Sequence, residues 1–316
     1  MKNRINLQHI DEAARIIDPI FLNTPQFRCE PLENVLGCQL LLKIETMNPT
    51  RSFKGRGACY AISKLPKNAK VVCASAGNLG QAMAYACRTQ GIPLIVYASK
   101  NANPLKIQMM RSFGAEVRLV AGDLDDAGDE AERVAVQENL TLIKDSLEVA
   151  TCEGAGTIGK ELLNWPDKLD IMLVALGGGA MLTGIGTWIK AKSPETLVIG
   201  IVAEGAPAME ESWRQGKVIE HTTINTIADG IAGRIPIPEV LEDMKSTVDD
   251  VLRVSDEALI AGMKLLFESA GIVTEPSGAC GVAAILSNKD FFRNKRVASV
   301  ICGGNLTPEQ MRKYLF

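Results

Sequence analysis

Short apolar segments alternate with helical patterns between residues 70 and 144. The apolar segments are five to eight residues long and rich in Val, Ile and Leu: KVVCAS, PLIVYAS, AEVRLVAG and LTLIK. The stretches between them carry apolar residues at helical spacing: AMAYACRTQ, PLKIQMMRSF and AGDEAERVAVQ. This alternation is typical of an α/β protein with parallel sheets, whose ligands collect at the carboxyl ends of the strands. No internal repeat or low-complexity tract is present.

Length and composition limit the classes of protein to consider. A chain of 316 residues with 47% hydrophobic and 22% charged residues can bury a large core and is long enough for two domains. The net charge of −3 argues against a nucleic-acid partner. No 18 apolar residues run together and the N-terminus has no long apolar core, so neither a membrane span nor a secretory signal is expected. We therefore predict a cytoplasmic protein without a membrane partner.

The cysteines and histidines do not form recognisable metal or disulfide patterns. The eight cysteines are scattered singly, mostly within apolar stretches, and no C-x-x-C pair occurs. This pattern predicts reduced, buried thiols and argues against a disulfide framework or a cysteine-built zinc site. The two histidines, His9 and His221, are too few and too far from the motifs below for a histidine metal site or a catalytic triad.

The stretch TMNPTRSFKGRGA, residues 46–58, is the most informative short motif. Lys54 follows an aromatic residue and lies among small and polar residues. A lysine that forms an imine needs a fixed position and a partly desolvated amine that can lose its proton near neutral pH. Taken alone, the stretch fits a solvated loop lysine better. The motifs further along the chain favour the imine lysine.

Two glycine-containing loops each join an apolar strand to a helix. The first is CASAGNLGQAMAYA at 73–86, where backbone N–H groups, the positive end of a helix and the side chains of Ser75 and Asn78 suit a carboxylate. The second is LVALGGGAMLTGIGTWI at 173–189, where three glycines let a phosphate approach the main chain. Each loop alone is a weak signal, because glycines at such turns are commonly packing or cap residues.

Several further segments follow in a fixed order along the chain: FLNTPQFRCEPLE, LLLKIETMNPTRSFKGRGA, SAGNLGQA, EGAGTIGKEL, ALGGGAML, TIADGI, TEPSGACGVAAI and ICGGN. Their order and spacing resemble the fold type II pyridoxal-phosphate enzymes, and within them the threonine/serine dehydratase and serine racemase family. The resemblance implies a tryptophan synthase β-like α/β fold with two domains, each a mainly parallel twisted sheet flanked by helices. It also implies a large domain of residues 1–67 and 146–316, a small domain of residues 68–145, and a homodimer.

The resemblance assigns roles to individual residues. Lys54 matches the lysine that holds pyridoxal phosphate as a Schiff base and then, as the free amine, removes the substrate Cα proton. Asn78 matches the residue that bonds the 3′ oxygen of the cofactor ring. The cofactor site comprises Phe53, Lys54, Asn78, Gly177, Gly178, Gly179, Ala180, Gly230 and Cys302. The loop for the substrate carboxylate comprises Ser75, Ala76, Gly77, Asn78 and Leu79. Phe53 is also compatible with an ordinary core aromatic.

Cys302 matches the position that faces the pyridine nitrogen of the cofactor. An aspartate there would keep the nitrogen protonated and favour transamination, whereas a weak thiol donor favours expulsion of a β-hydroxyl group. The resemblance therefore implies a lyase that converts L-threonine or L-serine into a 2-oxo acid and ammonia. In this family the cofactor phosphate supplies the proton to the leaving hydroxyl.

Three alternative functions share parts of this site. Serine racemases carry a hydroxyl-bearing second base where this chain has Ala76, so a racemase is disfavoured. The loop typical of β-replacement enzymes of the cysteine synthase kind is absent, and retention of Lys54 with Cys302 argues against a catalytically silent binding protein. Leu79 departs from the histidine common in the family, which leaves the shape of the substrate loop open.

A divalent cation and a role for Arg51 are two further hypotheses. Glu204, Ala208 and Glu210 fit the spacing at which several family members bind Mg²⁺ or Ca²⁺ through two acids and a carbonyl, although two exposed acids at a strand end explain the pattern as well. Arg51 either meets a substrate β-carboxylate, as in hydroxyaspartate, or pairs with a surface acid. We favour the surface role.

Overall fold

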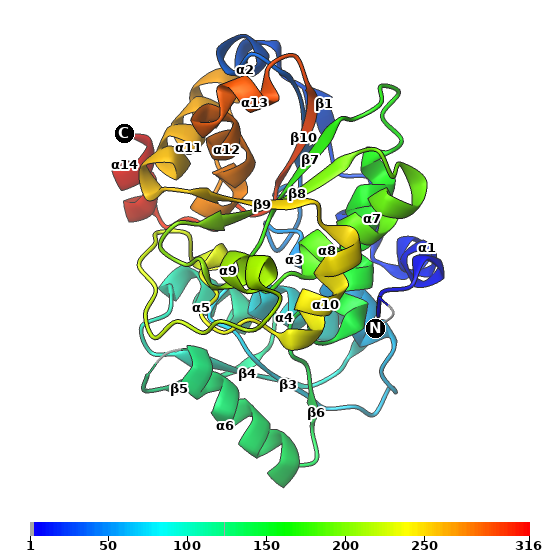
Figure 1. The fold of residues 1–316 in the computed structure, drawn as a ribbon. Helices are drawn as coiled ribbons and strands as arrows, with labels where there is room; N and C mark the ends of the chain where they lie inside the picture. The colour runs from blue at the N-terminus through cyan, green and yellow to red at the C-terminus, as the bar shows by residue number, and fades with distance from the viewer. Residues whose placement is uncertain (1–2, 123) are drawn as a thin grey trace.

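A computed structural model describes residues 3–122 and 124–316. The described chain contains two separate sheets, stacked one above the other in Figure 1. In the six-stranded sheet the order is β1 (Gln26–Arg28), β2 (Gln39–Ile44), β10 (Arg296–Ile301), β7 (Ile171–Ala175), β8 (Leu197–Ala203) and β9 (Asp250–Val254). Only β1 runs antiparallel to its neighbour, and the other pairs are parallel.

The four-stranded sheet is parallel throughout. Its strands are, in order, β5 (Glu116–Val120), β4 (Leu94–Ser99), β3 (Val71–Ala74) and β6 (Thr141–Leu142). These strands fall on the four apolar segments of the alternating pattern, because each segment presents branched apolar residues to a sheet covered on both faces. This sheet comes wholly from the segment 68–145. The limits of the two domains stay a prediction. Residues 1–2 and 123, which these limits include, lie outside the described part.

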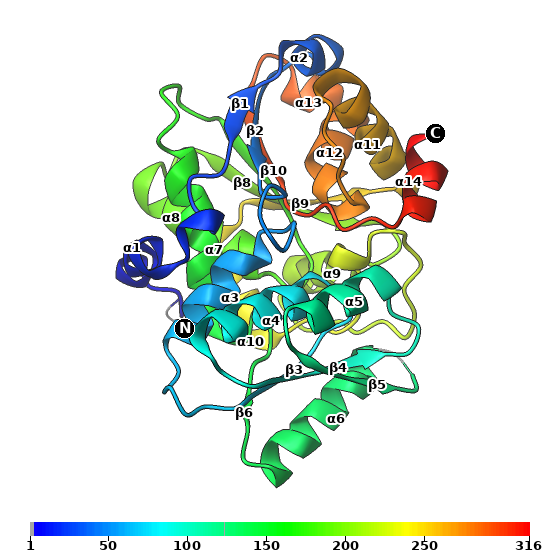
Figure 2. The same ribbon diagram turned by 180° about the vertical axis from the view of Figure 1, so that it is seen from behind.

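Helices cover both faces of each sheet (Figures 1 and 2). On one side of the larger sheet lie α2 (Glu30–Leu36), α11 (Asp256–Ala270), α12 (Cys280–Ser287), α13 (Lys289–Phe292) and α14 (Pro308–Leu315). On the other side lie α1 (Leu7–Ile16), α7 (Val149–Leu162), α8 (Ala180–Lys192), α9 (Ala208–Gln215) and α10 (Pro238–Thr247). Short 3₁₀ turns occupy Pro19–Phe21, Asp229–Ile231 and Pro276–Ala279. The α/β fold predicted from the sequence is confirmed.

The smaller sheet is covered by α6 (Leu124–Gln137) on one face and by α4 (Asn78–Gln90) and α5 (Pro104–Ser112) on the other. Helix α3 (Lys54–Ser63) packs against both α4 and α7 and so connects the two halves of the described structure. Glycines permit the close approach of α3 to α7. A Cβ on Gly57 would lie 2.6 Å from the carbonyl oxygen of Thr151, and one on Gly154 would lie 2.7 Å from Cα of Gly57. Lys54 is therefore held by a tightly packed helix.

The apolar core confirms two expectations about buried residues. The largest cluster fills both faces of the six-stranded sheet, and a second lies between the smaller sheet and the helices α3, α4 and α5. All eight cysteines are buried and unpaired, as the sequence predicted. Among the described residues, no helix is both long and apolar enough to cross a membrane.

Candidate active site

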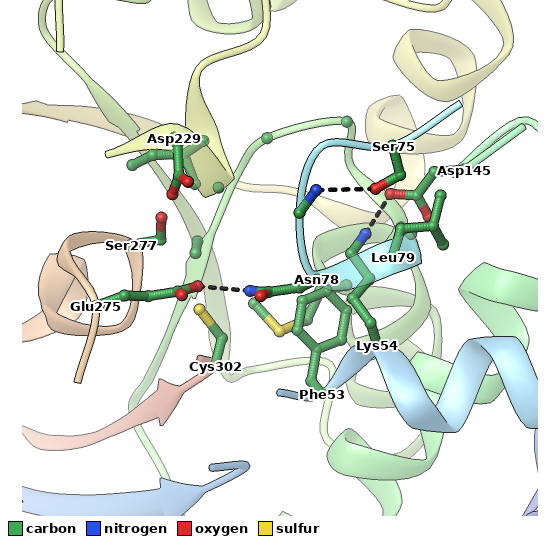
Figure 3. A pocket seen from close by; sticks show the side chains of 18 of the residues that line it. Phe53, Lys54, Ser75, Asn78, Leu79, Asp145, Asp229, Glu275, Ser277 and Cys302 are labelled. Atoms are coloured by element: carbon green, nitrogen blue, oxygen red, sulfur yellow. Dashed lines mark hydrogen bonds and ion pairs between the residues drawn. The ribbon is translucent and has the colours of Figure 1, made fainter. Parts of the chain in front are cut away.

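One pocket brings together the residues that the sequence singled out. It is lined from α3, from the loop between β3 and α4, from the loop between β7 and α8, and from the end of β10. The predicted residues among its lining are Phe53, Lys54, Ser75, Ala76, Gly77, Asn78, Leu79, Gly177, Gly178, Gly179, Ala180, Gly230 and Cys302. Every cofactor-binding and substrate-binding residue predicted from the sequence thus lies at this pocket, shown in Figure 3.

Lys54 is the first residue of α3, and its side chain is mostly buried, with 18% exposed. Its Nζ donates a hydrogen bond to the carboxylate of Asp145 and lies 4.8 Å from the ring centroid of Phe53. The amine is therefore fixed in the pocket wall rather than free in solvent. This position satisfies the geometric requirement for an imine-forming lysine.

The loop that leads into α3 is bound to the loop that follows β10. The amide of Phe53 donates to the carbonyl oxygen of Cys302 at 3.0 Å, and the amide of Gly304 donates to the carbonyl oxygen of Arg51 at 2.9 Å. Between these bonds, Ser52 and Gly303 form an isolated antiparallel bridge. The positions of Lys54 and Cys302 are consequently set by one hydrogen-bonded unit.

A buried ion-pair network lies behind the lysine helix. Arg56 is fully buried; its guanidinium donates to Glu45 at 2.8 Å and to Glu161 at 2.6 Å. Lys43 is also buried, and its Nζ donates to Glu161 Oε2 at 2.6 Å. Burial opposes the charge of Arg56, but the two carboxylates outweigh it and hold the pKa of the guanidinium above its ordinary value. Removing one member would leave an uncompensated buried charge, so the network fixes the orientation of α3.

The loop from Ser75 to Leu79 is shaped by the side chain of Ser75. Its Oγ accepts from the amides of Gly77 at 3.1 Å and Gly80 at 3.0 Å. Helix α4 begins at Asn78, and the first N–H groups of a helix have no carbonyl partner within it. The loop therefore presents main-chain donors and the positive end of a helix to the pocket, as a carboxylate requires.

Asn78 connects this loop to the opposite wall. Its Nδ2 donates to Glu275 Oε1 at 2.6 Å, and its Oδ1 accepts from Asn305 Nδ2 at 2.9 Å. Burial raises the pKa of Glu275 above its ordinary value, although Lys106 opposes this. Burial lowers the pKa of Lys106, but Glu275 and Asp229 outweigh it, so its pKa is raised and its ammonium persists. Lys106 donates to Asp229 at 2.7 Å and lies 3.9 Å from Glu275.

The three glycines before α8 form a tight turn against neighbouring segments. A Cβ on Gly177 would lie 2.6 Å from the carbonyl oxygen of Gly230, so this position has no room for a side chain. Gly179 has a φ of +99°, a conformation that L side chains rarely adopt. At the start of α8, the amide of Ala180 donates to the hydroxyl of Ser146 at 3.1 Å. The turn delivers a helix N-terminus to the pocket, which is a typical site for a phosphate.

Cys302 follows β10 and is 4% exposed. Burial raises the pKa of its thiol well above the ordinary value, and the neighbouring Cys280 and Glu275 add to the effect. The sulfur is therefore protonated and neutral near neutral pH. A neutral thiol is a weak donor and a weak acceptor.

The sequence analysis missed eight residues of the pocket, and five of them are polar or charged: Lys106, Asp145, Asp229, Glu275 and Ser277. Asp229 and Glu275 lie inside motifs that were recognised, TIADGI and TEPSGACGVAAI, so position within the motif was an available signal. Asp145 comes shortly after the short strand β6 and Lys106 is in the first turn of α5. Only the expectation that ligands gather at the carboxyl ends of parallel strands pointed to the Asp145 region.

The predicted cation ligands and Arg51 lie elsewhere. Glu204 is exposed, and Glu210 is 5% exposed with its carboxylate paired to Arg253 at 2.5 Å and to Arg214. No group of three or more His, Cys, Asp or Glu residues among the described residues is arranged to hold a metal ion. Arg51 is exposed and lines a different cavity. The surface role favoured for Arg51 agrees with this position.

The chain is similar to known pyridoxal-phosphate dependent enzymes in sequence and to solved structures in fold. The sequence profile of a family described as pyridoxal-phosphate dependent enzymes matches residues 17–303. The biosynthetic L-threonine dehydratase of Halalkalibacterium halodurans is 36% identical over 313 residues, covering 96% of this chain and 74% of that protein. An L-threo-3-hydroxyaspartate ammonia-lyase of Pseudomonas sp is 32% identical and covers 96% of both chains. Maize serine racemase superposes with a TM-score of 0.92 at 28% identity, covering 98% of this chain and 96% of that one.

The fold and the pocket define a fold type II pyridoxal-phosphate enzyme. The chain belongs to the pyridoxal-phosphate dependent enzyme family. The residues of the pocket fit that cofactor: a fixed lysine next to an aromatic ring, a glycine turn at a helix N-terminus, and a neutral thiol. The buried hydroxyl of Ser277 has no hydrogen-bond partner within the described part of the chain, and such an unsatisfied polar group is typical of a ligand site.

Proposed function

We propose that this protein is a pyridoxal-phosphate dependent ammonia-lyase that removes water from L-threonine or L-serine and releases a 2-oxo acid and ammonia. The observation that carries the proposal is the pairing of a fixed lysine with a neutral thiol in one pocket, through the bond from the Phe53 amide to the Cys302 carbonyl. The name of the relative from Halalkalibacterium halodurans, an L-threonine dehydratase, supports the choice of substrate.

The pocket residues divide into those that hold the cofactor and those that hold the substrate. The turn from Gly177 to Ala180 would hold the cofactor phosphate, Phe53 would pack against the ring, and Asn78 would donate to the 3′ oxygen. Gly230 contributes main chain near the ring, since its carbonyl lies close to Gly177. When bound, pyridoxal phosphate withdraws electrons from the substrate Cα and makes its proton acidic.

Lys54 is the proposed catalytic base. Its Nζ removes the Cα proton as the free amine, and its fixed position in α3 supplies the orientation that proton transfer requires. The main-chain donors of the loop from Ser75 to Leu79 hold the substrate carboxylate at the N-terminus of α4. Cys302 would serve as the neutral partner of the pyridine nitrogen, and a neutral thiol there would disfavour transamination and favour loss of the β-hydroxyl group.

A racemase is the second candidate, favoured by the similarity to maize serine racemase. Ala76 argues against it, because a methyl group cannot return a proton to the face of Cα opposite Lys54. Ala76 lines the pocket and has no titratable group, so it cannot act as the second base that a racemase needs. A β-replacement enzyme of the cysteine synthase kind has no specific observation in its favour.

Product analysis tests the proposal. The protein loaded with pyridoxal phosphate is incubated separately with L-threonine, L-serine and O-acetyl-L-serine plus sulfide. The proposal predicts 2-oxobutanoate from threonine and pyruvate from serine, in equal amount with ammonia. Formation of cysteine, or of D-serine in excess of pyruvate, would contradict it.

Three further expectations stay predictions: a cytoplasmic location, a homodimer, and a divalent cation at Glu204, Ala208 and Glu210. A cation at Glu210 would have to displace the guanidinium groups of Arg214 and Arg253 from its carboxylate. The site would be supported if added Mg²⁺ or Ca²⁺ raised the melting temperature of the unmodified protein, and if the Glu204→Ala variant melted at a lower temperature. An unchanged melting curve would contradict it.

A further inference from the structure

Asp145 is a charged residue of the pocket to which neither the motifs nor the proposed function gives a role. It lies between the smaller sheet and α7, and its side chain is 25% exposed. One carboxylate oxygen, Oδ2, accepts the hydrogen bond from Lys54 Nζ (Figure 3), while Oδ1 is buried and has no hydrogen-bond partner among the described residues. The carboxylate is thus only partly compensated, and Lys54 is its compensating cation.

The other charged side chains that line the pocket do not compensate the negative charge of Asp145. The charged residues among its described lining are two lysines and three acids: Lys54, Lys106, Asp145, Asp229 and Glu275. The ammonium of Lys106 forms ion pairs with Asp229 at 2.7 Å and with Glu275 at 3.9 Å. Acids therefore outnumber cations, and Lys54 must give up its positive charge to act as a base.

The position of Asp145 relative to the reacting atoms follows from its bond to Lys54. Under the proposed function, Lys54 Nζ takes a proton from the substrate Cα. A group in hydrogen-bond contact with that nitrogen lies within roughly 6 Å of Cα and of the first side-chain atoms of the substrate. An anionic substituent on Cβ would enter this region against the unpaired charge of Asp145, in a setting where water screens charges poorly.

Among the described residues that line this pocket, no unpaired cation other than Lys54 is available to receive such a substituent. Arg51, the residue considered for a β-carboxylate, is exposed and lines a different cavity. Lys106 is already paired. One relative is named for a substrate with a β-carboxylate, L-threo-3-hydroxyaspartate. The charges of this pocket instead favour a substrate with a neutral side chain.

We propose that Asp145 is a specificity-determining residue that excludes amino acids with a β-carboxylate and so restricts the enzyme to β-hydroxy amino acids with uncharged side chains. This inference rests on the proposed function, because it places the substrate Cα at Lys54. Exclusion by a like charge is a form of specificity in which an unfavourable contact rejects the wrong ligand.

The test compares two amino acids of nearly equal shape that cannot lose a β-hydroxyl group, L-asparagine and L-aspartate. Each is titrated into the protein loaded with pyridoxal phosphate, and the absorbance of the cofactor gives a dissociation constant. We expect aspartate to bind about 100-fold more weakly than asparagine, as a like charge at about 5 Å in a partly desolvated site implies. In Asp145→Asn, the ratio of the dissociation constant of aspartate to that of asparagine should fall at least tenfold. Asp145→Ser removes the same charge with a smaller side chain and should behave alike.

Asp229→Asn is the matched control, because it removes one negative charge from the same pocket at a position paired with Lys106 rather than Lys54. It should change the ratio less than Asp145→Asn does. Equal changes in the two variants, or a ratio near one in the unmodified protein, would overturn the inference.

Turnover separates this inference from the proposed function. If neither threonine nor serine yields a 2-oxo acid, the proposed function has failed. If threonine is converted and L-threo-3-hydroxyaspartate is converted equally well by the unmodified protein, only the inference has failed. We expect hydroxyaspartate to be a poor substrate whose rate relative to threonine rises in Asp145→Asn.

Discussion

The amide of Phe53 donates to the carbonyl oxygen of Cys302 across a distance of 3.0 Å. Together with the bond from the Gly304 amide to the Arg51 carbonyl, it joins the start of α3 to the end of β10, two segments about 250 residues apart in the sequence. It fixes Lys54 on one side and the buried thiol on the other. Lys54 and Cys302, the proposed base and the proposed partner of the ring nitrogen, are thereby held by one hydrogen-bonded unit.

Cys302→Ser and Cys302→Asp test the role of the thiol. Serine is also a neutral, weak donor and acceptor, so Cys302→Ser should keep the elimination rate within about tenfold. Aspartate would protonate the ring nitrogen and place a second carboxylate near Glu275, so we expect slower elimination and a shift towards transamination. Assays of 2-oxo acid and of pyridoxamine phosphate measure both. Equal elimination rates in the two variants would contradict the role of Cys302.

Gly177→Ala tests the glycine turn. The added Cβ would lie 2.6 Å from the carbonyl oxygen of Gly230, so the turn must shift and we expect a loss of about 1–3 kcal/mol in stability with weaker cofactor binding. Gly128→Ala is the control, because a Cβ there meets nothing within 4 Å and Gly128 lies inside α6. That variant should gain about 0.5–1 kcal/mol. Urea unfolding and equilibrium dialysis of pyridoxal phosphate provide the measurements.

Glu161→Gln tests the buried network behind Lys54. Glu161 compensates both Arg56 and Lys43, and breaking a buried pair typically costs about 3–5 kcal/mol. Because half of the compensation for Arg56 remains on Glu45, the lower end of that range is expected. Unfolding in urea at pH 7 gives the difference from the unmodified protein.

The same variant predicts a pH dependence. Burial raises the pKa of Glu161, but the hydrogen bonds and charge of Arg56 outweigh it and hold the pKa below the ordinary value. A depressed pKa in the folded state stabilises the protein above the unfolded value of about 4.3, and this contribution is lost as the pH falls through the folded value. The stability gap between the unmodified protein and Glu161→Gln should therefore narrow below about pH 4. A gap that is constant between pH 7 and pH 3 would contradict the assignment.

Ala76→Ser tests the separation of elimination from racemisation. With Lys54 as the single base, a proton returns to Cα only on the face it left, so the unmodified protein should form little D-serine from L-serine. The serine hydroxyl would add a group that can carry a proton within the same loop, and D-serine should rise measurably. Chiral chromatography decides: abundant D-serine from the unmodified protein would favour a racemase.

The motif residues predicted from the sequence all line one pocket, while the roles that the resemblance gives them stay predictions. A lysine at a helix start and glycines at strand-to-helix turns are local features that a motif can carry, so the order of several motifs and their resemblance to a family could locate them. Partners across the fold could not be found in this way. Asp145 contacts Lys54 from 91 residues away, and Arg56 received no role in the sequence analysis although it pairs with Glu161, 105 residues away, as a buried charge. Its burial depends on the packing of α3 against α7, which no local pattern reveals.

The most direct test of the account is the attachment point of the cofactor. The purified protein is loaded with pyridoxal phosphate, reduced with borohydride and digested, and the peptides are examined by mass spectrometry. Lys54→Ala serves as the control: it should lose turnover entirely, yet still retain cofactor through the separate glycine turn. The account predicts one pyridoxyl-bearing peptide, modified at Lys54. A pyridoxyl group on Lys106 or another lysine, or on none, would contradict it.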